Sequence, residues 1–170
     1  MFRRILVPVD GSHASGLGLA KAIELAKDQR ATLCLLHVID ERSITQNLDG
    51  GAAEIDRLFD SLRAAGKQIL ARAEAKTRKQ RVRTKVVLIE NIIRSVADVI
   101  VGQAKKWRAD LIVIGTHGRR GISRLVMGSD AEGVVRTTPA PVLLVRSNAR
   151  RQRGSLIRRP EQSYRLETLP

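Results

Sequence analysis

Three glycines and a serine in the last third of the chain are the residues best suited to chemistry. Gly115, Gly118 and Gly128 are spaced as G-x2-G-x9-G, and Ser129 follows at the start of a predicted helix. Glycine lets backbone amides face outward and form an anion-binding concavity. The first turn of a helix adds unpaired amides and a dipole that favours phosphate. The spacing therefore predicts a site for a phosphorylated ligand.

Positive charge accompanies these glycines. Arg119, Arg120 and Arg124 lie in the same segment and could contact phosphate, although a solvated surface role is the alternative. The two standard phosphate motifs are absent. A Walker loop requires Gly-Lys-Ser/Thr, which this segment lacks, and a dinucleotide fingerprint would follow the first strand, where only Asp10-Gly11-Ser12 is found.

The elements that must position these residues alternate between strands and helices. Apolar runs predict strands, and 3.6-residue periodicity predicts helices between them. The strands are expected at Arg4–Val9, Ala31–Ile39, Arg83–Ile89, Asp110–Gly115 and Val142–Arg146, and the helices at Ala14–Gln29, Ala53–Gln80, Ile92–Arg108 and Met127–Thr137. Continuous apolar strands joined by helices indicate an open, doubly wound α/β fold with a parallel sheet. Ligands bind at the carboxyl edge of such sheets, where the strand order reverses.

Composition limits the possible partners. The 170 residues carry a net charge of +14, yet only 2% are aromatic, which is too few for a stacking platform. We therefore expect nucleic acid to be an unlikely main partner. No apolar run is long enough to span a membrane. The single cysteine, Cys34, and the lack of an export signal at the N-terminus favour a cytoplasmic location.

Three motifs together resemble the universal stress protein family. They are Val7-Pro-Val-Asp-Gly-Ser12, the glycine pattern that ends at Ser129, and Pro141-Val-Leu-Leu-Val145. The resemblance runs from about Phe2 to Arg146 and implies a five-stranded parallel sheet in the order 3-2-1-4-5 with helices on both faces. It implies a nucleotide-binding domain at residues 1–147. Beyond this domain the composition shifts to Arg, Gln, Ser, Pro and Glu with few apolar residues, which predicts a basic, flexible tail at 148–170.

The resemblance also implies an ATP site, because the G-x2-G-x9-G-[ST] subgroup of the family binds ATP. ADP and AMP are alternative ligands, and Mg²⁺ or Mn²⁺ is an optional companion. Asp10 would contact the ribose, the backbone near Val38 the adenine, and the glycines with Ser129 the phosphates. The implied site residues are Pro8, Asp10, Val38, Gly115, His117, Gly118, Arg119, Gly128, Ser129 and Asp130.

Structural roles remain open for several of these residues. Asp10 and Ser129 could serve as helix caps, and His117, like His13 and His37, could be a structural hydrogen-bond partner. Asp130 departs from the family pattern, in which a small apolar residue often follows the serine. Its carboxylate would repel phosphate unless it points away or shares a divalent cation.

These observations predict a cytoplasmic, ATP-binding regulatory or protective module of the stress response. The apolar Val142–Val145 strand is expected to pair in a homodimer. One alternative is a slow ATPase or adenylating enzyme of the same fold, although the sequence has no nucleophile–base–orienter set. Another is a basic adaptor that contacts nucleic acid or anionic surfaces through the Arg-rich tail.

Overall fold

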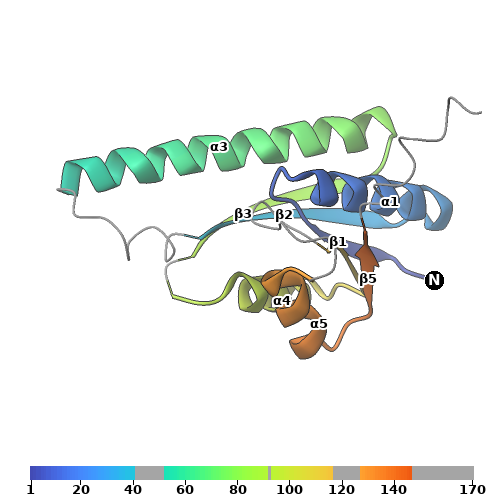
Figure 1. Ribbon diagram of the computed structural model, residues 1–170. Coiled ribbons are helices and arrows are strands. Elements are labelled where there is room, and N and C mark those ends of the chain that lie inside the picture. Colours follow the sequence, from blue (N-terminus) through green and yellow to red (C-terminus); the bar gives the residue numbers. More distant parts are fainter. Residues whose placement is uncertain (41–51, 92, 117–126, 147–170) are drawn as a thin grey trace, which may run out of the picture.

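The fold is built on one parallel sheet (Figure 1). The computed structural model describes residues 1–40, 52–91, 93–116 and 127–146. The strands are β1 (Arg4–Pro8), β2 (Thr32–Asp40), β3 (Thr84–Asn91), β4 (Leu111–Gly115) and β5 (Val142–Val145). They are ordered β3-β2-β1-β4-β5, and all neighbouring pairs are parallel. The predicted strand order is confirmed.

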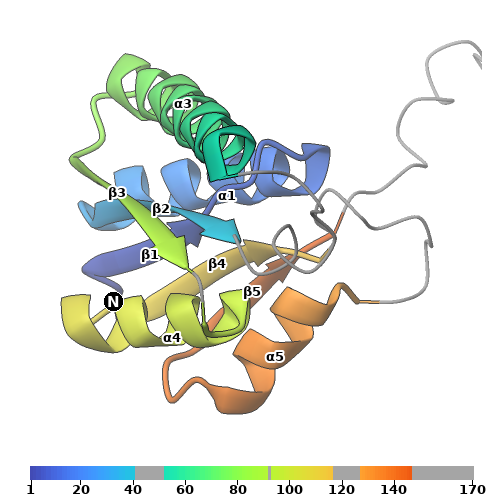
Figure 2. The same cartoon turned by 90° about the vertical axis from the view of Figure 1, so that its left-hand side faces the viewer.

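Helices cover both faces of this sheet, as predicted. They are α1 (His13–Gln29), α3 (Ala52–Lys79), α4 (Val96–Trp107) and α5 (Ser129–Thr137). Helices α1 and α3 lie on one face, and α4 and α5 lie together on the other (Figures 1 and 2). None of the helices in the described ranges is long and apolar enough to cross a membrane.

The core forms two layers because successive strand residues point to opposite faces. Ile5 and Val7 of β1 belong to the layer beneath α1 and α3, whereas Leu6 belongs to the layer that packs on α4 and α5. All three side chains are fully buried. Burying a side chain of this size contributes roughly 1.5–3 kcal/mol to folding. The central strands are therefore the most firmly held, and their ends are rigid supports for the loops.

Helix caps set the helix boundaries. Ser12 Oγ accepts a hydrogen bond from Ser15 N at 3.1 Å and begins α1, and Ser95 Oγ accepts one from Asp98 N at 3.1 Å and begins α4. The third predicted helix was expected to begin at Ile92. It begins at Val96 because the Ser95 side chain satisfies an amide of the first turn. The tail predicted at 148–170 lies outside the described residues.

Candidate functional site

The reversal of strand order lies between β1 and β4. These strands pair directly, with Ile5 opposite Leu111 and Leu6 opposite Ile112. From β1 the chain crosses to β2 on one side, and from β4 it crosses to β5 on the other. The carboxyl ends of β1 and β4 are therefore neighbours, with a helix N-terminus following each. This is the position at which open α/β sheets bind their ligands.

Asp10 occupies a tight turn between β1 and α1. Its Oδ1 atom accepts a hydrogen bond from Ser12 N at 2.9 Å, and its own amide donates to Ser15 Oγ at 3.4 Å. Gly11 has φ of +81°, a left-handed conformation that glycine adopts without strain. The side chain that caps α1 is Ser12 rather than Asp10. Asp10 is held, half-buried, at the edge of the sheet.

His37 braces the segment that leads into this turn. Its Nδ1 atom lies 2.6 Å from the carbonyl oxygen of Val9, and Nδ1 must carry the proton because a carbonyl only accepts. Val9 N also donates to Leu36 O at 2.8 Å. The ring is buried against Gly66 of α3, where a β-carbon would lie 2.8 Å from His37 Cδ2. His37 is therefore the structural hydrogen-bond partner that the sequence predicted.

Gly115 ends β4 beneath the first turn of α1. A β-carbon at Gly115 would lie 2.6 Å from the carbonyl carbon and 2.7 Å from the carbonyl oxygen of Ala14. Gly18 makes the reciprocal approach, since a β-carbon there would lie 3.4 Å from Gly115 N. The sequence predicted a phosphate contact for Gly115, with a tight turn that needs no ligand as the alternative. The contact with α1 is a second, purely structural requirement for glycine at this position.

Thr116 is a key residue of this edge that sequence reasoning missed. Its amide donates to Val145 O at 3.0 Å, and its carbonyl accepts from Gly128 N at 2.8 Å. Its backbone thus joins the end of β4 both to β5 and to the start of α5. No side-chain pattern signals this role, because both bonds are made by the main chain.

The N-terminus of α5 lies at the same end of the sheet as Asp10. Gly128 is the N-cap residue, with φ of −61° and ψ of 144°, and glycine has no side chain with which to cap the helix. Any residue adopts these angles, so backbone conformation does not require glycine here. Ser129 and Asp130 are exposed in the first turn. Ser129 therefore does not serve as the cap, which was its alternative role.

The remaining predicted site residues fall into two groups. Pro8 is the last residue of β1, and Val38 lies near the end of β2 with its side chain packed toward α4 and α5. Both are half-buried and lie toward the same edge as Asp10. His117, Gly118 and Arg119, with the neighbouring Arg120 and Arg124, lie outside the described residues.

A salt bridge fastens α3 to the carboxyl end of β3. Arg63 donates from Nε and Nη2 to the two carboxylate oxygens of Glu90, at 2.8 and 3.0 Å, and from Nη1 to Asp60 at 3.0 Å. The bidentate contact lowers the pKa of Glu90 and raises that of Arg63. Both side chains are largely solvated, so this pair orients α3 more than it stabilises the fold.

The part of the chain that the structure describes offers neither a metal-binding cluster nor a reactive thiol. Within the described ranges, no three His, Cys, Asp or Glu side chains lie together in a way that could hold a metal ion. Cys34 is fully buried in β2, and burial raises the pKa of its thiol, partly offset by a hydrogen bond with Gln103 and by the charge of Lys85. Such a thiol is unsuited to nucleophilic chemistry at neutral pH.

Known proteins are similar to this chain in both sequence and fold. The model of the universal stress protein family matches residues 1–146. Universal stress protein YxiE of Bacillus subtilis (strain 168) is 32% identical over 151 residues, covering 86% of this chain and 100% of that protein. Universal stress protein UspA from Lactobacillus plantarum has a TM-score of 0.73 at 26% identity, covering 85% of this chain and 98% of its own.

A further solved structure shows the same fold with a nucleotide present. It is the universal stress protein from Archaeoglobus fulgidus in complex with dAMP, which has a TM-score of 0.62 at 24% identity and covers 85% of this chain and 98% of its own. At this identity the likeness shows the fold alone. The family match over residues 1–146 and the 32% identity to YxiE decide the assignment. The present chain belongs to the universal stress protein family.

Proposed function

We propose that this universal stress protein binds ATP, or its relatives ADP and AMP, at the carboxyl edge of the sheet between Asp10 and the start of α5. The observation that carries the proposal is Gly128. Its backbone angles suit any residue, and a serine or asparagine at this N-cap would bond an amide of the first helical turn, yet the position is glycine. A close approach by a ligand explains that choice, because a phosphate at a helix N-terminus contacts bare amides.

Asp10 is the proposed contact for the ribose. The hydrogen bond that the Ser12 amide donates to the Asp10 carboxylate fixes this carboxylate before a ligand arrives. The hydrogen bond from His37 to the Val9 carbonyl holds the preceding residue in place. A fixed carboxylate accepts hydrogen bonds from ribose hydroxyls with little loss of side-chain entropy. The backbone near Val38 and Pro8 would line the adenine side. Gly115, His117, Gly118, Arg119 and Ser129 would surround the phosphates.

The carboxylate of Asp130 would repel a triphosphate bound at the start of α5. Asp130 and Glu132 place two carboxylates in the first turn of α5, where they favour the helix dipole but oppose phosphate. Mg²⁺ or Mn²⁺ bound to the phosphates would remove this repulsion by sharing an oxygen of Asp130. We therefore expect the metal to raise ATP affinity more than AMP affinity.

The proposed role is regulatory. A bound nucleotide would contact the carboxyl ends of β1 and β4. It would thereby change the contacts made by β5, which is the outermost strand beside β4. Leu144 on that strand is 37% exposed, and its neighbours are half-buried. An exposed apolar edge strand is suited to pairing with a second copy. The expected form is a cytoplasmic homodimer that binds ATP without rapid turnover.

Equilibrium dialysis of the full chain against labelled ATP and AMP, with and without Mg²⁺, tests the proposal. Asp10→Asn should weaken both ligands by roughly tenfold, because a charged acceptor is replaced by a neutral one. The matched control is Asp28→Asn, an exposed position in the last turn of α1, which should bind as the parent does. Equal affinities for the parent and Asp10→Asn, or no binding by the parent at millimolar ATP, would overturn it.

A further inference from the structure

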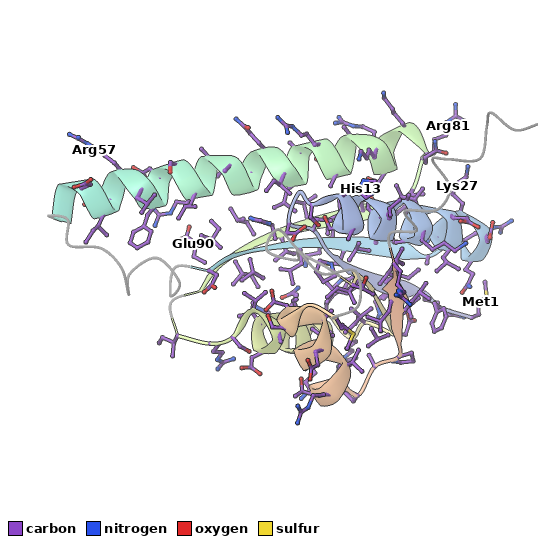
Figure 3. All side chains as sticks on the ribbon, in the orientation of Figure 1. Met1, His13, Lys27, Arg57, Arg81 and Glu90 are labelled. Carbon is purple, nitrogen blue, oxygen red and sulfur yellow. The ribbon has the colours of Figure 1, made fainter. Side chains whose placement is uncertain are left out.

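A cleft lies at the end of the sheet opposite Asp10, where the strands begin. It has a volume of about 550 Å³, and the residues that matter for its chemistry are Arg3, Arg4, Arg30, Thr32, Arg83 and Asp110. Small-molecule sites typically occupy roughly 300–1,000 Å³. Met1 also lines this cleft, and Figure 3 shows it at the same end of the molecule as Lys27 and Arg81, away from Arg57 and Glu90.

Backbone hydrogen bonds give this cleft a fixed frame. Thr32 N donates to Arg3 O at 2.8 Å, and Asp110 N donates to Arg4 O at 2.9 Å. The Asp110 carboxylate in turn accepts from Arg3 N at 2.7 Å and from Arg4 N at 3.0 Å. The one carboxylate among the residues that line the cleft is therefore held by main-chain amides and forms no ion pair with the guanidinium groups.

The cleft keeps a positive charge after its own neighbours are counted. None of its four arginines forms a salt bridge within the described residues. Arg83 Nη2 donates to Arg30 O at 3.1 Å, at the C-terminus of α1. The four arginines carry four positive charges. The C-terminus of α1 offsets roughly half a charge and Asp110 offsets one, so a net charge of roughly +2.5 remains in the cleft. Stabilising the helix end does not account for so many cations.

We infer that this cleft binds the phosphate chain of a small molecule. Guanidinium groups match phosphate oxygens with paired hydrogen bonds, and several of them around one hollow favour a ligand with two or more adjacent phosphates. A nucleic acid strand is the less suitable occupant, because a chain with 2% aromatic residues offers no stacking surface. The cleft lies at the other edge of the sheet from Asp10, so it is separate from the proposed nucleotide site.

Calorimetric titration of the full chain with inorganic tripolyphosphate at physiological salt tests this inference. The test variant is Arg3→Gln/Arg30→Asn. Asparagine accepts the left-handed conformation of residue 30, where φ is +54°, so the fold should be kept. The control is Arg57→Gln/Lys67→Gln, which removes the same charge from exposed positions on α3 outside the cleft.

The cleft variant should lose tripolyphosphate affinity by about tenfold or more, and the control by less than about twofold. Backbone amide shifts on titration should concentrate at Thr32, Arg83 and Asp110. Equal losses of tripolyphosphate affinity in the two variants would mean that net charge alone explains the binding, and would overturn the inference. Amide shift changes confined to residues outside the cleft would also overturn it. A single-stranded oligonucleotide that displaces tripolyphosphate and binds more tightly would overturn the small-molecule assignment.

Discussion

The amide of Gly128 donates a hydrogen bond of 2.8 Å to the carbonyl oxygen of Thr116. This bond holds the start of α5 against the end of β4. The Thr116 amide also donates to Val145 O at the end of β5, so one residue fixes three elements at the carboxyl edge. Main-chain hydrogen bonds thus help to set the position of the α5 amides.

Gly115→Ala should destabilise the protein. The new methyl group would overlap the backbone of Ala14, at 2.6 and 2.7 Å from its carbonyl atoms, and a helix backbone cannot rotate away as a side chain can. We expect a loss of about 1–3 kcal/mol in the free energy of unfolding, measured by urea denaturation. Gly102→Ala in α4 is the control, because nothing lies within 4 Å of a β-carbon there. It should be neutral or stabilise by up to about 1 kcal/mol, and similar results for both variants would contradict the account of Gly115.

Ser12→Ala and Ser95→Ala should separate capping from ligand binding. Each removes the side-chain cap of one helix, so each should lower the free energy of unfolding by about 1 kcal/mol. Ser12 Oγ also holds Ser15, whose hydroxyl oxygen accepts a hydrogen bond from the Asp10 amide in the turn that forms one side of the proposed site, so losing the Ser12 side chain should loosen this turn. Only Ser12→Ala should therefore weaken AMP binding in a dialysis measurement. Equal AMP affinities for the two variants would mean that the α1 turn is not part of the site.

Cys34 should make the free energy of unfolding decrease as the pH rises into the alkaline range. Burial raises the pKa of its thiol above the ordinary value of 9.0, so the unfolded chain loses this proton first as the pH rises. The stability contributed by the neutral thiol is complete below pH 9.0 and decreases above it. Unfolding free energies of the parent and Cys34→Ala, measured from neutral pH to about pH 10, should show a steeper decline for the parent. Parallel pH profiles would contradict this reading.

The architecture was predictable because its physical causes are visible in the sequence. Strands buried on both faces must be apolar throughout, and the runs that contain Ile5 and Ile112 are so. Helices between such strands require parallel crossovers. The resemblance to universal stress proteins then supplied the strand order, which the structure confirms. His37 was likewise expected to be a structural hydrogen-bond partner, and its bond to Val9 O fulfils that role.

Features that depend on contacts between residues far apart in the sequence were harder to predict from the sequence. Gly115 was predicted to contact phosphate or to form a tight turn, and nothing local reveals that Ala14 would pack against it. Thr116 was missed because its bonds are made by the backbone. The arginine-lined cleft is formed by four separate segments, containing Arg3, Arg30, Arg83 and Asp110, and the sequence shows only the contribution of these residues to net charge.

The most direct test of the central claim is the ATP affinity of Gly128→Ser, measured by equilibrium dialysis alongside the unfolding free energy of the same variant. Serine is a better N-cap than glycine and adopts the same backbone angles, so the fold should be as stable as the parent or slightly more stable. Its side chain would occupy the space proposed for phosphate. The account predicts unchanged or increased stability with ATP affinity reduced by about tenfold or more. A variant that folds normally and binds ATP as tightly as the parent would contradict a phosphate site at the start of α5.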